Sequence, residues 1–290
     1  MPVVILPQTL DELLDLKANC DSSAILAGGT DLFVQMRNKK IQPQTLICLD
    51  QLKDKGLREV ADMGDEISIG AAVTHSQLIQ NPLVQHHFPI LLQALKTLGS
   101  PQIRNMGTLG GNIMTASPAG DTLPPLYVLD AQVELAGKNG SRRMPISRFI
   151  TGPESTCLKP EEILYRIWIP KSPSHDLHYF EKIGHRKSLS IAILSLAALV
   201  DLTEEKKIRA IRLAWGSVGK TIITSPETEK LLLGNPMDDP TGFILAAARI
   251  REEGSPISDV RARAEYRRQV AGNLVMRLCQ GPLKQELIKQ

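Results

Sequence analysis

Apolar side chains recur along most of this chain at spacings typical of helices or strands. The pattern predicts helices that begin after Thr9, Thr30 and Thr74, and two more at 89–98 and 122–129. It predicts single strands at 25–27, 45–49 and 165–169. Two hairpins are also predicted, one of 57–61 with 67–71 and one of 131–136 with 142–146 across Asn139-Gly140. Pro170 and Pro173 follow and cannot continue a strand inside a sheet. We therefore expect a domain boundary near Pro173.

The pattern changes beyond Pro173. Strands come first, at 177–182, 191–202 and 207–218, and helices follow, at 226–233, 241–251 and 261–280. Strands followed by helices favour an α+β layer over a doubly wound parallel sheet. The expected fold class is therefore α+β, with one domain at 1–173 and a smaller one at 174–290 that contains a three-stranded sheet and helices.

One stretch, residues 102–121, has no hydrophobic period and is rich in Gly, Thr, Ser, Asn and Asp. Its glycines, at 107, 110 and 111, permit positive φ, so that backbone N–H groups could converge on a ligand. The stretch adds neutral polar groups and one carboxylate, from Thr108, Asn112, Thr115, Ser117 and Asp121. Such a loop suits a pyrophosphate, although a loop of this kind, taken alone, is more often a structural turn.

A second pair of glycines strengthens the interpretation as a ligand site over that as a structural turn. Gly28-Gly29 separates the strand at 25–27 from a helix for which Thr30 is the expected N-cap. Strand, turn and helix start form the arrangement in which free N–H groups and the helix dipole favour an anion. A plain connection explains this unit equally well by itself, but two such loops in one domain favour a ligand site.

Composition and charge narrow the function. The chain has 290 residues, 42% hydrophobic content and a net charge of +3, which give no reason to expect nucleic acid binding. No apolar run approaches the roughly 20 residues that span a bilayer, so we expect a soluble, cytoplasmic protein. The cysteines are scattered, and no triad or carboxylate pair stands out, so we assign neither a metal nor a catalytic residue.

Four segments carry a resemblance to a known family. The segments 27–31 and 108–112, the latter followed by 116–121, resemble the two FAD-binding signatures of the flavoprotein subunit of molybdenum hydroxylases, a group that includes xanthine dehydrogenase and carbon monoxide dehydrogenase. The segments 180–186 and 258–268 resemble two further motifs of that family. The resemblance implies an FAD-binding domain in two lobes, about 1–55 and 56–173, followed by the smaller α+β domain.

The resemblance also implies which residues hold FAD. They are Leu26, Ala27, Gly28, Gly29, Thr30, Asp31, Leu32, Thr108, Leu109, Gly110, Gly111, Asn112, Thr115, Ser117, Asp121, Leu164 and Lys182. Backbone amides and hydroxyls of 27–31 and 108–112 would hold the pyrophosphate. Leu164 would pack on the cofactor, and Lys182 would place a positive charge near it.

The carboxylate of Asp121 would lie away from the phosphates, which would repel it, and would accept from a ribityl hydroxyl or a ring N–H. Thr115 and Ser117 would lie on the same side, toward the ribityl chain and the ring. Each charged residue also has a structural alternative. Asp121 could be the N-cap of the helix at 122–129, and Lys182 could be a solvated strand residue.

The implied activity is electron relay within a complex. A molybdenum-pterin subunit would oxidise the substrate, a subunit with two [2Fe-2S] clusters would pass electrons singly, and FAD would collect two of them for an acceptor. An aromatic side chain can cover the flavin in dehydrogenase members, and Leu98 stands at that place here. This departure counts against NAD⁺ as the acceptor and leaves a quinone, a ferredoxin-like carrier and oxygen open. A stand-alone FAD oxidoreductase and a non-redox nucleotide-binding module are the alternative functions.

Overall fold

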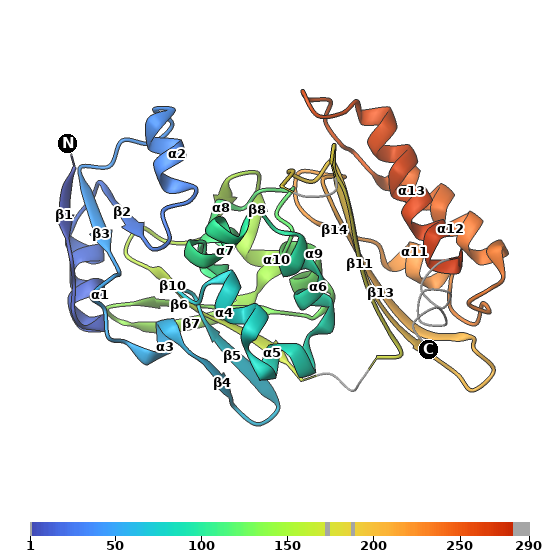
Figure 1. The fold of residues 1–290 in the computed structure, drawn as a ribbon, viewed down its shortest axis with the longest axis horizontal. Coiled ribbons are helices and arrows are strands. Elements are labelled where there is room, and N and C mark those ends of the chain that lie inside the picture. Colours follow the sequence, from blue (N-terminus) through green and yellow to red (C-terminus); the bar gives the residue numbers. More distant parts are fainter. Residues whose placement is uncertain (1, 172–174, 187–188, 281–290) are drawn as a thin grey trace. The chain divides into compact units, whose positions relative to one another are not determined.

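The computed structural model describes residues 2–171, 175–186 and 189–280 (Figure 1). These residues divide into two compact units. The first contains 2–86, 100–117 and 130–171, and the second contains 87–99, 118–129 and the described residues from 175 onward. Two early segments therefore fold with the C-terminal part of the chain.

The first unit begins with a three-stranded parallel sheet in the order β1-β3-β2. Its elements are β1 (Val3–Ile5), α1 (Leu10–Asn19), β2 (Ser23–Leu26), α2 (Leu32–Arg37) and β3 (Thr45–Cys48). Helix α1 begins at a capping box of Thr9 and Glu12, as predicted. The N-cap of α2 is Asp31, which corrects the prediction of Thr30.

A five-stranded antiparallel sheet forms the rest of the first unit, in the order β4-β5-β10-β6-β7. Its strands are β4 (Val60–Asp62), β5 (Glu66–Gly70), β6 (Gln132–Gly137), β7 (Gly140–Pro145) and β10 (Ile163–Pro170). The β6–β7 hairpin pairs Gly137 with Gly140, so its turn lies one residue earlier than predicted. The predicted strand at 57–61 is partly wrong, because Lys55–Arg58 forms helix α3 and β4 begins only at Val60.

Short helices and a small hairpin complete this unit. They are α4 (His75–Gln80), α5 (Pro82–His87), α7 (Pro101–Met106), α8 (Leu109–Thr115), α10 (Ile146–Phe149), β8 (Ile150–Gly152) and β9 (Ser155–Thr156). Helix α8 corrects the prediction of an irregular glycine loop. Thr108 is its N-cap and accepts from the Gly111 N–H, and neither Gly110 nor Gly111 has a positive φ.

The second unit is a four-stranded antiparallel sheet with helices on both faces (Figure 1). Its elements are α6 (Pro89–Thr97), α9 (Leu123–Val128), β11 (Leu177–Ile183), β12 (Leu194–Leu202), β13 (Ile208–Gly216), β14 (Ile223–Thr224), α11 (Pro226–Lys230), α12 (Pro240–Glu253) and α13 (Ala264–Gln280). The two-residue strand β14 adds to the three predicted strands. The predicted α+β fold class is confirmed.

The core of the second unit lies between the sheet and the helices α12 and α13. Leu196, Leu213 and Trp215 of the sheet are fully buried there with Phe243 and Leu274. The other face of the sheet is covered by α6 and α9, which contact β11, β12 and β13. Within residues 2–171, 175–186 and 189–280, no helix is long and apolar enough to cross a membrane.

Candidate functional site

The first glycine pair forms the turn between β2 and α2. Gly29 has a φ of +67°, which only glycine adopts without strain. A Cβ added to Gly28 would lie 1.8 Å from the carbonyl oxygen of Met106, so no side chain fits at this position. The backbone N–H groups of Gly28, Gly29, Thr30 and Asp31 donate to no other described residue. Four neighbouring donors are therefore available to a ligand, and donors so arranged suit a diphosphate.

The second glycine pair is organised differently. The Leu109 N–H donates to the carbonyl oxygen of Val73 at 3.0 Å, and the Gly110 N–H donates to that of Ala71 at 2.9 Å. The Gly111 N–H donates to the Thr108 hydroxyl oxygen at 3.0 Å. These amides are therefore engaged inside the protein, contrary to the expectation that they would be free for a pyrophosphate. This segment can contribute to a ligand site through its side chains and through the close approach that its glycines permit.

Gly110 shows why that approach needs glycine. A Cβ added there would lie 2.6 Å from both the Cβ and the carbonyl oxygen of Ala71. Gly111 is less restricted, because an added Cβ would meet only the Thr108 hydroxyl, at 2.9 Å. Gly110 therefore sets the packing of α8 against the residues that follow β5.

The structure brings most of the predicted residues of the first unit together. The Thr115 hydroxyl donates to the Asp31 carboxylate at 2.9 Å, which joins α8 to the N-cap of α2. A cavity of about 290 Å³ is lined by Ala27, Thr108, Gly110, Gly111 and Leu164, among others. A second cavity, of about 130 Å³, shares Ala27 and Thr108 with the first and adds Gly28, Asn105 and Arg58. These residues fit an elongated nucleotide cofactor with a diphosphate.

Three lining residues, Leu49, Arg58 and Asn105, escaped the sequence analysis. The Arg58 guanidinium donates to the carbonyl oxygens of Leu52, at 3.0 Å, and of Leu49. These bonds hold the side chain in place at the cavity. The apolar period of 57–61 indicated a strand and so concealed α3, which carries Arg58.

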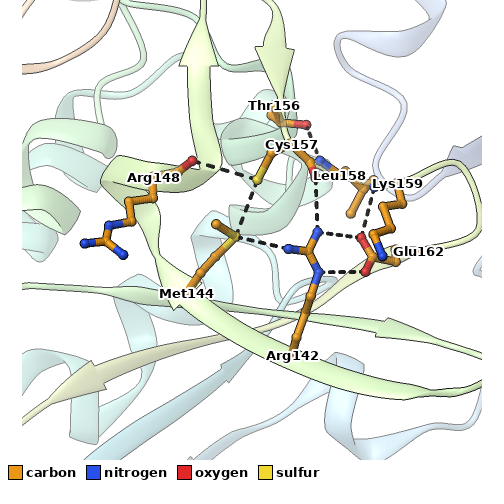
Figure 2. Close-up of polar contacts among 8 residues, drawn as sticks. All are labelled: Arg142, Met144, Arg148, Thr156, Cys157, Leu158, Lys159 and Glu162. Atoms are coloured by element: carbon orange, nitrogen blue, oxygen red, sulfur yellow. Dashed lines mark hydrogen bonds and ion pairs between the residues drawn. The ribbon is translucent and has the colours of Figure 1, made fainter.

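An ion pair between a partly exposed arginine and a buried glutamate, with side chains 39% and 9% exposed, anchors the segment before β10 (Figure 2). The Arg142 Nε and Nη2 groups donate to the two oxygens of the Glu162 carboxylate, at 2.7 and 2.9 Å. Arg142 also donates to the Cys157 carbonyl oxygen at 3.1 Å, and the Lys159 N–H donates to Glu162 at 2.9 Å. The hydrogen bond from Arg142 lowers the pKa of Glu162. This network ties β7 to the segment before β10 and so supports Leu164 at the cavity.

In the second unit, Asp121 and Lys182 form an ion pair. The Lys182 ammonium donates to Asp121 Oδ2 at 2.5 Å, and the side chains of Lys182 and Asp121 are only 8% and 9% exposed. Burial raises the pKa of Asp121 to about 6, although the charge of Lys182 and its hydrogen bond act against the rise. Asp121 is not a helix cap, because the N-cap of α9 is Thr122, and Lys182 is not a solvated residue. Asp121 Oδ1 is buried and accepts from no other described residue, so it can accept from a ligand.

His75 is buried at the first position of α4, beside the second glycine segment. Its backbone N–H donates to the Gly107 carbonyl oxygen at 3.0 Å. Burial, and then the charge of Arg104, lower the pKa of the imidazole to about 4. The side chain is therefore neutral at pH 7.

Comparisons with known proteins identify the family. Residues 2–172 match the family described as FAD binding domain in molybdopterin dehydrogenase, and residues 179–281 match CO dehydrogenase flavoprotein C-terminal domain. The chain is 31% identical to the nicotinate dehydrogenase FAD-subunit of Eubacterium barkeri, over 80% of this chain and 79% of that one. It is also 31% identical to the carbon monoxide dehydrogenase medium chain of Afipia carboxidovorans, over 87% and 86%.

Solved structures agree with these relatives. Carbon monoxide dehydrogenase from Hydrogenophaga pseudoflava matches with a TM-score of 0.89 and 28% identity, over 95% of each chain. Quinoline 2-oxidoreductase from Pseudomonas putida matches with a TM-score of 0.90 and 26% identity, over 96% of this chain and 95% of that one. The chain therefore belongs to the family of FAD-binding medium subunits of molybdenum hydroxylases, and it is an oxidoreductase subunit with FAD as its cofactor.

Proposed function

We propose that this subunit holds FAD at the two glycine segments and relays electrons from [2Fe-2S] clusters of a partner subunit to an acceptor. The electrons would originate at a molybdenum-pterin subunit of the same complex. FAD, when bound, supplies an electron store that exchanges one or two electrons. The observation that carries the proposal is the row of N–H groups at Gly28, Gly29, Thr30 and Asp31, which donate to no other described residue. Gly28 lines the smaller cavity, and Gly110 and Leu164 line the larger one.

Each part of the site has a distinct role in this proposal. The four amides of 28–31 bind the diphosphate, because they are unpaired donors at one turn. Thr108 and Leu164 line the cavity along the rest of the cofactor. Asp121 and Lys182 of the second unit stay predicted cofactor residues. Within that unit Asp121 Oδ1 has no partner among the described residues and would accept from a ribityl hydroxyl or a ring N–H, while Lys182 pairs with Asp121 Oδ2.

The absorbance spectrum of the purified chain with added FAD tests the cofactor site. We expect Gly28→Ala to abolish the retained flavin bands, because its Cβ would overlap the Met106 carbonyl oxygen at 1.8 Å. Gly137→Ala is the matched control, since its Cβ would meet its nearest neighbours at 3.6 and 3.7 Å, which is ordinary contact. Retention of flavin by Gly28→Ala at the level of Gly137→Ala would rule out the first glycine turn as the diphosphate site.

The acceptor is proposed separately. Leu98, at the end of α6, is 8% exposed and offers no aromatic ring to cover a flavin. This favours a quinone, a ferredoxin-like carrier or oxygen over NAD⁺. Reoxidation of the photoreduced, FAD-loaded chain by each acceptor, under anaerobic conditions for all but oxygen, measures the preference. Reoxidation by NAD⁺ that is faster than by the others would overturn it.

A cytoplasmic location is the last part of the proposal. All four cysteines, Cys20, Cys48, Cys157 and Cys279, are free thiols in the structure. Unpaired thiols are typical of reducing compartments. Fractionation of cells that produce the chain at native level would test the location, and recovery of the chain outside the cytoplasmic fraction would contradict it.

A further inference from the structure

Two histidines and an aspartate gather at one end of the sheet of the second unit. His178 lies on β11, four residues before Lys182, and His175 lies just before the strand. Asp201 lies on β12, which pairs with β11. His178 and Lys182 are four residues apart on one strand, which corresponds to about 13 Å along it. The cluster is therefore distinct from Asp121 and Lys182, the predicted cofactor residues of this unit.

Asp201 fixes the tautomer of His175. The His175 Nδ1 lies 2.7 Å from Asp201 Oδ1, and the two side chains are 13% and 21% exposed. A carboxylate accepts at this distance, so in the neutral imidazole Nδ1 carries the hydrogen and Nε2 carries the lone pair. The Nε2 atom is buried and has no hydrogen-bond partner among the described residues. His175 therefore holds a lone pair in a fixed direction that nothing in the described chain uses.

His178, next to His175, also has a buried ring nitrogen without a hydrogen-bond partner in the part of the chain that the structure describes. This nitrogen is its Nδ1. The two rings are 5.7 Å apart between centroids and 74° apart in orientation.

We propose that His175 and His178 form a two-imidazole site for a borderline transition-metal dication, Zn²⁺ or Cu²⁺. A nitrogen–metal bond of about 2.0–2.1 Å puts the centroids of two imidazoles on one metal on the order of 5–6 Å apart, and the observed 5.7 Å lies in that range. Asp201 acts as the carboxylate that orients a ligating histidine through its other nitrogen. Imidazole nitrogen selects these metals over Mg²⁺ and Ca²⁺, which prefer oxygen ligands.

The ligand count sets the strength of the site. Within the described ranges, no group of three or more His, Cys, Asp or Glu side chains is placed to hold a metal together. The described residues therefore supply two nitrogens. A site with two protein ligands exchanges its metal. A bound metal would link His175, which lies just before β11, to His178 on that strand.

Calorimetric titration of the metal-free, full-length chain with Zn²⁺ tests the proposal, with and without bound FAD. We expect one Zn²⁺ per chain, binding at least tenfold weaker in His175→Gln and in His178→Gln, and no uptake of Mg²⁺. Asp201→Asn keeps both imidazoles and loses their orienting group, so we expect a loss of about tenfold. His86→Gln, at an exposed position in the first unit, is the matched control and is expected to bind as the wild type does.

A second measurement does not depend on how the variants fold. X-ray absorption at the zinc edge of the loaded wild-type chain counts imidazole ligands, and two are expected. Absence of saturable Zn²⁺ or Cu²⁺ uptake by the wild type, unchanged affinity in both histidine variants, or a zinc environment without imidazole would each overturn the proposal.

Discussion

Asp121 is a single residue at which burial and charge act against each other. The unfolded chain has an aspartate pKa near 3.8, and burial raises the pKa of the folded-state carboxyl to about 6. The folded state therefore holds the proton more tightly, and this group favours folding most below about pH 4. The free energy of unfolding should fall by about 2–3 kcal/mol through this residue as the pH rises from about 4 to about 6.

Urea unfolding at a series of pH values from 4 to 7 measures this contribution. Asn at position 121 does not titrate, so we expect the Asp121→Asn variant to lose this part of the pH dependence, whatever the change in its absolute stability. The difference between the two profiles isolates the carboxyl from all other titrating groups. Parallel profiles for wild type and variant would show that the pKa of Asp121 does not differ between the folded and unfolded chains.

The role of this residue could be narrowed from the sequence only to two alternatives. A polar residue before a helical pattern is compatible with an N-cap and with a ligand contact. Its partner, Lys182, lies 61 residues away, and no local pattern reports a contact of that range. The free amides at 28–31 could be predicted, because a strand, a glycine turn and a helix start follow one another there. The engaged amides at 109–111 could not, since their acceptors belong to residues 71, 73 and 108.

Strand β7 is joined to the segment before β10 by the ion pair of Arg142 and Glu162, and we expect its contribution to stability to depend on the burial of Glu162. Glu162 is 7% exposed and receives two hydrogen bonds from Arg142. Arg142→Met would leave the carboxylate buried without its cation, and we expect a loss of about 1–3 kcal/mol in the free energy of unfolding. We also expect weaker FAD binding, because the segment before Leu164 loses its anchor.

The pair of Lys40 and Glu154 in the same unit is the matched control. It has a similar distance, 2.8 Å, but its side chains are 54% and 63% exposed. Solvent screens such a pair, so Lys40→Met should cost clearly less free energy of unfolding than Arg142→Met. Denaturant unfolding of both variants, together with FAD titration, makes the comparison, and an equal loss in the two would refute the dependence on burial.

A helix could be predicted from the sequence where the residues that specify it are close together in the chain. The helices at Thr9 and Thr74 begin with capping boxes, whose groups are three residues apart, and both could be predicted. Helix α8 could not, because two adjacent glycines lower helix propensity and packing against Ala71 compensates for it. Helix α3 was missed for the opposite reason, since Leu57 is apolar and buried and fits a strand period as well.

Each of the two compact units is built from segments that are not continuous in the sequence. Residues 87–99 and 118–129 belong to the unit that contains the C-terminal sheet. Their helices, α6 and α9, cover one face of that sheet, and the side chain of Gln93 on α6 bonds the β11 backbone twice, to the His178 carbonyl oxygen and from the Phe180 N–H, each at 2.9 Å. The predicted boundary near Pro173 separates two groups of sequence motifs. That it also separates two independently folding domains stays a prediction.

A fragment of residues 174–290 tests whether that boundary separates independent domains. The fragment lacks α6 and α9, so the buried residues Ala197, Leu199 and Ala214, which alternate along β12 and β13 with the core of the other face, would be exposed to water. We expect no cooperative urea transition in the fragment when Trp215, its one tryptophan, is followed by fluorescence. The full-length chain with Trp168→Phe carries the same single reporter and should unfold cooperatively. A cooperative transition in the fragment at the same midpoint would show that α6 and α9 are not needed, and that the predicted boundary is also a folding boundary.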